Sequence, residues 1–399
     1  MIGKMKFKFF QYLLFFEHFT DSIIFLNNLL NTSLYFYIFS VFPIMLNPRR
    51  STNEIMEEII FDDIGSYPLP EGVSKEWVQN AFKTRAEDEK LYTVINDAFQ
   101  QKIDAGVDVV TYPQYQDMNE QFLKIIRDPN CCDSPFEVKL ECARIEELEA
   151  IEKVAKAYKE QFGETLKVRI CVTGPTELYL REFGGTRYTD IYSLFAKSVN
   201  NFVRNSMRSA KNFKITTVSI DEPSIGLNPE ITFDENDIIS ALTDASKAAS
   251  KWGADVEIHL HSPLYYNLAC EVPTINVIGV ESAGTPSYLE LIDKKVLEDT
   301  DSFLRLGIAR TDIYTLAGVL NEKYCTNVWK DKQYLPEIVS ELETPATITK
   351  RLRIYYRRFG NLIKYVGPDC GLGSWPNQRI AFILLSNVAQ GIKDFKESL

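Results

Sequence analysis

The chain has 399 residues, of which 45% are hydrophobic and 12% aromatic, so it can bury one large core or two ordinary ones. Its 44 basic and 55 acidic residues give a net charge of -11, and no dense stripe of Lys and Arg runs through it, which excludes nucleic acid as an expected partner. The seven cysteines are odd in number and scattered, unlike the dense frameworks of small secreted domains, and predict a cytoplasmic location.

Residues 1–55 differ in composition from the rest of the chain. No charged residue occurs from Ser22 to Pro48, which is typical of a membrane segment, but several asparagines and Pro43 interrupt the apolar run. Three interpretations stay open: an extension that the fold does not need, a membrane anchor, or a packed helix. We treat residues 1–55 as a hydrophobic N-terminal extension and expect membrane contact only if it is an anchor.

From Met56 onward, short runs rich in β-branched residues alternate with longer amphipathic stretches. Each short run has the length and composition of a buried strand. The candidate strands are residues 61–65, 106–112, 166–174, 215–221, 255–261, 275–281, 302–308 and 362–369.

The stretches between the candidate strands predict helices. Ile145, Leu148 and Ile151 repeat at helical spacing, Gly163 supplies a stop, and residues 188–207 repeat the pattern. Eight strands separated by helices in about 340 residues favour a (β/α)8 TIM barrel over a doubly wound sheet. We therefore predict one barrel domain over residues 56–399, with an insertion over residues 321–344.

Polar residues gather where the candidate strands end, which in a barrel is the face that carries the chemistry. His261 ends the fifth candidate strand, Glu281 ends the sixth, and Cys370 follows the eighth. Nitrogen, oxygen and sulfur donors from separate strands are what an open zinc site needs. The sequence therefore predicts a Zn²⁺ site formed by these three side chains.

Seven short stretches carry a resemblance to a known family: DDIGSYP, ICVTGP, SIDEPSIG, EIHLHS, NVIGVESAG, LGIARTD and VGPDCGL. In this order and spacing, across residues 60–372, they resemble the catalytic barrel of the cobalamin-independent methionine synthases, in its short archaeal form. The resemblance implies that His261, Glu281 and Cys370 bind zinc. It also implies methyl transfer to a thiol, with homocysteine converted to methionine.

One departure from the family concerns the metal ligands. The family has a cysteine two residues after the histidine of the fifth strand, and this chain has Pro263 there. The three remaining donors and an incoming thiolate would complete a tetrahedron, or His259 or Cys270 would supply the missing donor. His259 lies on the same side of its strand as His261, because side chains in a strand repeat every two residues.

Four further residues are predicted to bind the substrate. The resemblance implies that Asp221 binds the amino group and Ser66 the carboxylate, with Glu222 in the same substrate site. Gln114 stands where the long bacterial enzymes have an acidic residue that contacts the amino acid. Read without the family, Asp221 suggests a helix cap and Ser66 a turn residue.

Asp221 and Asp312 are expected to be catalytic. Asp312 follows the seventh candidate strand, where the family commonly shows an Asp-x-His that handles protons. Here Tyr314 replaces the histidine, and a neutral phenol is a poor substitute base.

The chain has only the catalytic half of the long enzymes, so the expected methyl donor is a methylcorrinoid, carried by a corrinoid protein, instead of a folate. The alternatives are methyl transfer to another thiol such as coenzyme M, a barrel of the uroporphyrinogen decarboxylase kind, and a binding protein that has lost zinc. The decarboxylase is disfavoured, because it gives the metal donors no purpose.

Overall fold

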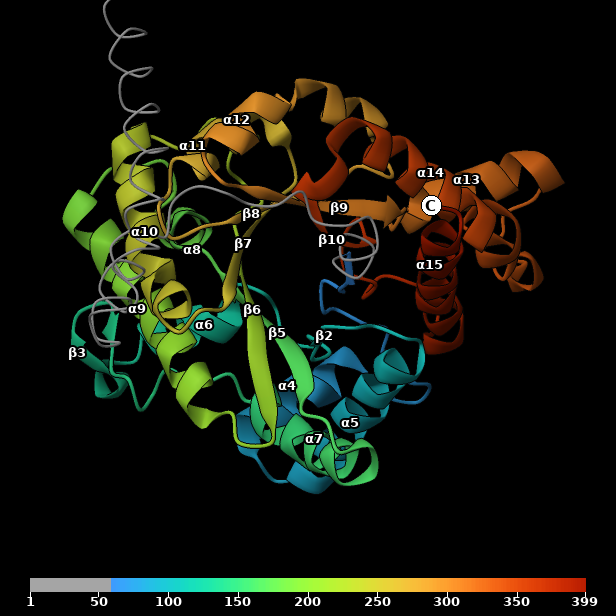
Figure 1. Ribbon diagram of the computed structural model, residues 1–399. Helices are drawn as coiled ribbons and strands as arrows, with labels where there is room; N and C mark the ends of the chain where they lie inside the picture. The colour runs from blue at the N-terminus through green and yellow to red at the C-terminus, as the bar shows by residue number, and fades with distance from the viewer. Residues whose placement is uncertain (1–58) are drawn as a thin grey trace, which may run out of the picture. The chain divides into compact units, whose positions relative to one another are not determined.

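The computed structural model describes residues 59–399, so the predictions for residues 1–55 lie outside the described range (Figure 1). Within it, each of the eight predicted strand positions contains a β-strand. The strands are β1 (Ile60–Phe61), β2 (Val110–Thr111), β5 (Leu166–Thr173), β6 (Phe213–Asp221), β7 (Asp255–Leu260), β8 (Val277–Val280), β9 (Phe303–Ala309) and β10 (Ile363–Pro368).

These eight strands form one sheet with the order β1-β10-β9-β8-β7-β6-β5-β2, and every neighbouring pair is parallel. A parallel bridge between Asp62 and Val109 joins the two edges of the sheet. Beside it, the amides of Asp108 and Val109 donate to the carbonyl of Phe61 at 2.9 and 3.1 Å. The sheet therefore curls round on itself, which is the mixed α/β, TIM-barrel-like arrangement that the strand pattern predicts.

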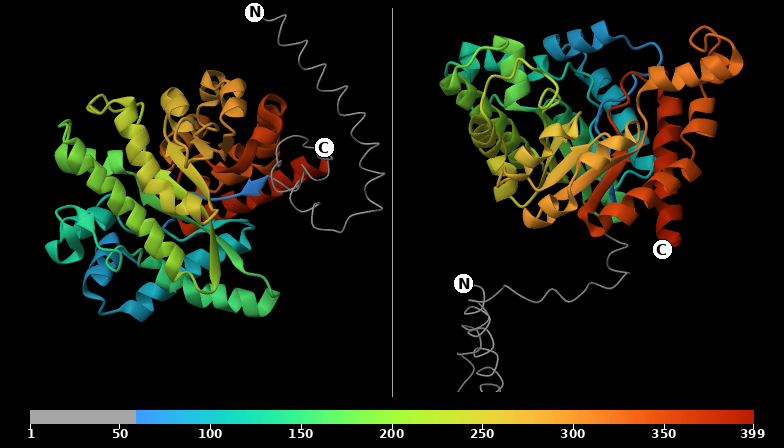
Figure 2. Two further views of the ribbon diagram at one scale, coloured as in Figure 1. Left: turned by 60° about the vertical axis from the view of Figure 1, so that its left-hand side comes forward. Right: turned by 90° about the horizontal axis from the view of Figure 1, so that it is seen from above.

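Helices connect successive strands and lie on the outside of the curled sheet (Figures 1 and 2). They are α4 (Lys75–Thr84), α5 (Asp88–Asp104), α6 (Glu120–Ile126), α7 (Glu147–Phe162), α8 (Pro175–Phe183), α9 (Thr189–Ser209), α10 (Glu235–Lys251), α11 (Tyr266–Cys270), α12 (Lys294–Asp299), α13 (Ile313–Tyr324), α14 (Pro345–Phe359) and α15 (Gln378–Glu397). Helices α7 and α9 match the two predicted helices. Helix α7 ends at Gly163, whose φ of +74° suits a residue without a side chain and whose amide donates to the carbonyl of Lys159.

Two connections differ from simple helical crossovers. An antiparallel hairpin of β3 (Cys132–Ser134) and β4 (Glu137–Val138) follows α6 and was not predicted. In the predicted insertion, α13 runs to Tyr324 and is followed by a 3-10 turn (Lys332–Tyr334) and a π-helical turn (Ile338–Leu342). Among residues 59–399, no helix combines the length and apolar character needed to cross a bilayer.

The barrel interior contains a network of fully buried charges. The guanidinium of Arg169 contacts Asp62 at 2.7 Å and Glu257 at 3.1 Å, and Nε of Arg305 contacts Asp62 at 3.0 Å. Two cations thus face two carboxylates in a region without water contact. Because Glu257 and His259 are two residues apart on β7, their side chains point to the same side of the strand. His259 therefore extends the inward-facing row of β7 toward the carboxyl end of the sheet.

Candidate metal centre

Four potential metal ligands meet at the carboxyl ends of three strands. His259 lies on β7 and His261 directly after it, Glu281 follows β8, and Cys370 lies two residues beyond β10. One donor atom from each of the four lies within 4.8 Å of the others. Nε2 of His261 is 3.5 Å and Nε2 of His259 is 3.9 Å from Oε1 of Glu281, and Sγ of Cys370 is 4.0 Å from Nε2 of His259. We call these four residues the ligand quartet.

The spacing of the quartet fits a tetrahedral metal. Ligand atoms about 2.0–2.3 Å from zinc lie about 3.3–3.8 Å from one another, close to the separations seen here. Oε1 of Glu281, which both imidazoles approach, is buried and has no hydrogen-bond partner among the described residues. Such an oxygen is a donor that a cation satisfies. The two imidazoles, one carboxylate and one thiol are also the donor types that zinc prefers.

His259 lies with the three predicted ligands, where a fourth donor would be needed. The imidazole rings of His259 and His261 lie 5.3 Å apart, centroid to centroid, at the same end of β7. Pro263 instead begins a short 3-10 turn (Pro263–Tyr265), and Cys270 is buried at the end of α11, outside the quartet. The structure thus brings together the three predicted ligands and places His259, and not Cys270, beside them.

The protonation of the quartet favours metal binding. Burial, with the charges of His261, Arg169 and Arg305, holds the pKa of His259 well below its usual value, and burial also lowers the pKa of His261. Both imidazoles are therefore neutral at pH 7, with a nitrogen lone pair available.

The pKa values of the two acidic ligands, Glu281 and Cys370, shift in the opposite direction. Burial, followed by the nearby charge of Asp369, raises the pKa of Glu281 to about 7. Burial, followed by the charge of Glu281, raises the pKa of Cys370 to about 12. By itself the protein therefore resists two negative charges at this place. A divalent cation removes that penalty, because it stabilises the ionised forms of both ligands.

Asp369 fixes the positions of two ligands. Its buried carboxylate accepts the amides of Ala283 at 2.8 Å and Gly284 at 2.7 Å, which follow Glu281. The residue before Cys370 is thus tied to the segment after Glu281. Gly307 of β9, which lies between the two strands, leaves the room for this contact, because a Cβ at that position would lie 1.8 Å from Oδ1 of Asp369.

Ser66 and Gln114, predicted to bind substrate, follow β1 and β2. Oγ of Ser66 accepts the amide of Gly373 at 3.2 Å, and its carbonyl accepts the amide of Leu372 at 2.8 Å. The amide of Gln114 donates to the carbonyl of Gly65 at 3.4 Å. Ser66 therefore lies against the turn that carries Cys370, and Gln114 lies beside the residue that precedes Ser66.

Asp221 and Glu222 have different surroundings although they are neighbours. Asp221 accepts the hydroxyl of Ser219 at 2.6 Å, and burial raises its pKa. Glu222 is fully buried and accepts the amides of Thr176 at 2.9 Å and Glu177 at 2.8 Å, so it caps the first turn of α8. Burial raises the pKa of Glu222 to about 8. Glu222 thus holds the start of α8, while Asp221 keeps a carboxylate without a backbone partner.

Asp312, predicted to be catalytic, caps α13. Its carboxylate accepts the amides of Tyr314 and Thr315 at 3.1 and 3.2 Å and the hydroxyl of Thr315 at 2.5 Å. The hydrogen bond from the Thr315 side chain is the main reason that its pKa is lowered. Asp312 is exposed and lies outside the quartet.

Sequence reasoning missed Glu177, in the first turn of α8. Its carboxylate accepts the side-chain amide of Asn119 at 3.3 Å and the hydroxyl of Ser224. Its charge also raises the pKa of His261, against the larger, lowering effect of burial. The available signal was its position three residues after Gly174, just beyond the end of a barrel strand. An acidic residue in the first turn of a helix, however, is also explained by its favourable interaction with the helix dipole.

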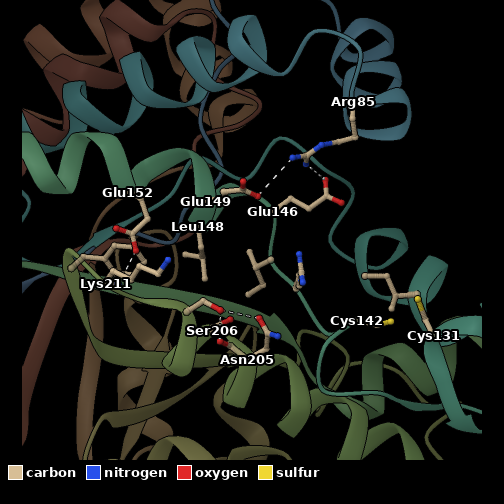
Figure 3. Close-up of a pocket in the computed structure, with 15 residues that line it drawn as sticks. Arg85, Cys131, Cys142, Glu146, Leu148, Glu149, Glu152, Asn205, Ser206 and Lys211 are labelled. Carbon is tan, nitrogen blue, oxygen red and sulfur yellow. Dashed lines mark hydrogen bonds and ion pairs between the residues drawn. The ribbon is translucent and has the colours of Figure 1, made fainter.

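A cavity of about 680 Å³ lies elsewhere, beside α7 and the end of α9 (Figure 3). On one side Arg85 contacts Glu146 at 3.4 Å and Glu149 at 3.7 Å, and on another Cys131 lies beside Cys142. None of the predicted site residues lines this cavity. The metal centre and this cavity are therefore separate features.

No family model and no curated protein sequence matches the chain. Among solved structures it is similar to a B12-independent methionine synthase from Shewanella sp. W3-18-1 in complex with selenomethionine, with a TM-score of 0.54 and 13% identity over 85% of this chain and 98% of that one. A methyltransferase from Methanosarcina mazei gives a TM-score of 0.48 and 11% identity, over 86% and 96% of the two chains. The homocysteine methyltransferase MmuM from Escherichia coli gives a TM-score of 0.41 and 12% identity, over 86% of this chain and 100% of that one. At these identities, the similarity to the synthase shows a shared fold.

Proposed function

We propose that the protein is a zinc-dependent methyltransferase that methylates a thiol, converting homocysteine to methionine. The observation that carries the proposal is the ligand quartet, which gathers two nitrogens, one oxygen and one sulfur at the carboxyl ends of barrel strands. That face is where barrel enzymes carry their chemistry, and this donor set suits zinc. The fold shared with a methionine synthase agrees with this function.

The residues of the quartet prepare the site for a thiol. Two neutral imidazoles, one carboxylate and one thiolate would balance the charge of Zn²⁺. When bound, zinc would lower the pKa of an incoming thiol so that it is held as the thiolate, which is the nucleophilic form. The partial burial of Glu281 and Cys370 limits the access of water, so charges at this place interact strongly.

The residues around the quartet would orient an amino acid. We assign Asp221 to the ammonium group, and Ser66 with Gln114 to the carboxylate side, where the turn after Cys370 lies. Glu222 would act indirectly, because its carboxylate is used to hold α8. Asp312, exposed on the loop after β9, is ionised at neutral pH and would pass the released proton to solvent.

The net charge of the site bears on the methyl donor. A thiolate held at a neutral site is less nucleophilic than one held at an anionic site, as nucleophilicity falls with thiol pKa. We therefore propose an activated donor, a methylcorrinoid delivered by a corrinoid protein. Coenzyme M stays an alternative thiol, since it would use the same four ligands.

The test is metal analysis combined with thiol titration. The purified protein should contain about one zinc per chain, and its Co²⁺-substituted form should change its visible spectrum when homocysteine binds, because a thiolate joins the ligands. Methionine should then form from homocysteine and methylcobalamin. A protein that holds neither zinc nor cobalt would instead be a binding protein without the enzymatic site. If the spectrum responds to coenzyme M but not to homocysteine, coenzyme M is the substrate.

A further inference from the structure

We propose that Glu177, with Asp221, binds a cationic amino group of the substrate and so selects amino-acid thiols over thiols without an amine. This inference rests on the proposed function and names the substrate class of the same site. Glu177 is thereby assigned a specificity-determining role that neither the motifs nor the ligand set indicated.

The position of Glu177 follows from hydrogen bonds between adjacent strand ends. Helix α8 begins directly after β5, and the amide of Gly174 at this junction donates to the carbonyl of Asp221 at 2.9 Å. The amide of Glu177 donates to Glu222 at 2.8 Å, which is the next residue after Asp221. In the register of the sheet, Asp221 on β6 stands beside His259 on β7. Glu177 and Asp221 are therefore neighbours on the wall of the site next to the quartet.

The carboxylate of Glu177 is held in place without being neutralised. Its two partners, the amide of Asn119 and the hydroxyl of Ser224, are both uncharged and come from the loops after β2 and β6. Among residues 59–399, no ion pair includes Glu177 or Asp221. Glu177 has no cationic partner, and Asp221, which is half-buried, reaches Arg169 only through the hydroxyl of Ser219. The two carboxylates therefore make this wall a place for a positive group.

The opposite wall offers the complementary chemistry. Ser66 lies after β1, against the turn that follows β10, and its Oγ accepts the amide of Gly373, which leaves its hydroxyl proton to donate to an anion. In the sheet order, β1 and β10 are separated from β6 and β7 by β8 and β9. A zwitterionic amino acid would place its ammonium group at Glu177 and its carboxylate at Ser66. An anionic thiol without an amine would be repelled by the carboxylates of Glu177 and Asp221.

The experiment is calorimetric titration of the zinc-loaded full chain with three thiols. Homocysteine carries both charges, 4-mercaptobutanoate lacks the ammonium group, and 3-mercaptopropylamine lacks the carboxylate. Glu177→Gln removes the charge but can still bond Asn119 and Ser224. It should weaken the two amine-bearing thiols about tenfold and leave 4-mercaptobutanoate unchanged or tighter.

Two further variants separate charge from structure. Glu182→Gln, on the same helix but paired with Arg127, should leave the affinity for all three thiols unchanged. Ser224→Ala keeps the charge of Glu177 and loosens its position, so it should weaken the amine-bearing thiols less than Glu177→Gln does. The zinc content of every variant should stay at that of the parent.

The outcomes distinguish this inference from the function on which it rests. An equal loss for all three thiols in Glu177→Gln, or no loss for any, would overturn the role of Glu177 and leave thiol methylation standing. If the parent protein bound none of the three thiols, the proposed function would fail, and the selectivity with it.

Discussion

The barrel contains two groups of ionisable residues, a fully buried one and, above it, a partly buried one, and they are stabilised differently. In the lower group, formed by Asp62, Arg169, Glu257 and Arg305, every charged side chain has an opposite charge within 3.1 Å. In the upper group, the ligand quartet, the only side-chain nitrogens of the described residues within 4.0 Å of Glu281 are those of two neutral imidazoles. The protein neutralises the first group with its own residues. The second group resembles a site built to receive a cation from outside.

The largest expected effect comes from breaking the lower group. Arg169→Met would leave Glu257 buried without its ion-pair partner and Asp62 with Arg305 alone, which should lower the free energy of unfolding by about 3–5 kcal/mol. Urea denaturation of the metal-free protein measures this loss. Arg187→Met is the control, because Arg187 is paired with Asp234 and Asp237 at the surface and should change stability little. Equal effects of the two variants would contradict the view that the interior network holds the barrel together.

Breaking the upper group should affect metal binding before folding. Alanine in place of His259, His261, Glu281 or Cys370 should each weaken zinc binding by at least about 100-fold, because one of four donors is lost. Competition with a chromophoric chelator measures the affinity. Cys325→Ala, at an exposed cysteine, is the control and should bind zinc like the parent. If His259→Ala binds zinc as tightly as the parent, His259 is a packed core residue and not a ligand.

A third buried carboxylate, Glu222, sharpens the comparison, because backbone amides stabilise it instead of a cation. Its folded pKa of about 8 lies above its ordinary value of 4.5. The folded state therefore binds more protons than the unfolded state between these values, so Glu222 makes stability fall as pH rises from about 4.5 to 8. The slope from this one group is at most about 1.4 kcal/mol per pH unit.

Glu222→Gln should flatten that part of the pH dependence. Urea denaturation of the parent and the variant at several pH values between 5 and 8 gives the two slopes. Equal slopes would mean that Glu222 is ionised throughout this range and that its two amide bonds outweigh the cost of burial.

The smallest effect is expected at Pro263. With His259 as the proposed fourth donor, Pro263→Cys should change zinc affinity by less than about threefold. In combination with His259→Ala, the same change tests whether position 263 faces the metal. Recovery of affinity by the double variant would show that the two positions can substitute for each other, and a failure to recover would leave His259 without a replacement.

The barrel-like fold and the meeting of His261, Glu281 and Cys370 at one place could be predicted because their signals are local. The strands are continuous β-branched runs, and His261, Glu281 and Cys370 stand where those runs end. The role of His259 could not be decided from the sequence, because a histidine inside a barrel strand is usually a packed residue and only distances to Glu281 and Cys370 distinguish the cases. The β3–β4 hairpin was missed because its strands are two and three residues long, too short to show periodicity.

The roles of the acidic residues were harder to predict for a related reason. Glu222 follows Asp221 in a motif that suggests substrate binding, yet its carboxylate bonds to amides of α8 that lie 45 and 46 residues earlier in the chain. Asp312 bonds within its own helix, a capping pattern that its position before α13 also suggests. Which acid caps a helix and which faces the site depends on how the loops meet in space, and no spacing along the chain records that.

Strand β9 contributes no residue to the quartet, but it leaves room for a contact between the two segments that carry Glu281 and Cys370. Asp369 reaches from the end of β10 to the segment after β8, and it can do so only because Gly307 presents a flat backbone beneath it. Strands β8 and β10 are two strand spacings apart, about 9.6 Å, too far for a direct backbone hydrogen bond. The carboxylate of Asp369 therefore links the segment after Glu281 to the residue before Cys370 across an intervening strand. This contact between two segments of the candidate site thus depends on a residue of a third strand that has no side chain.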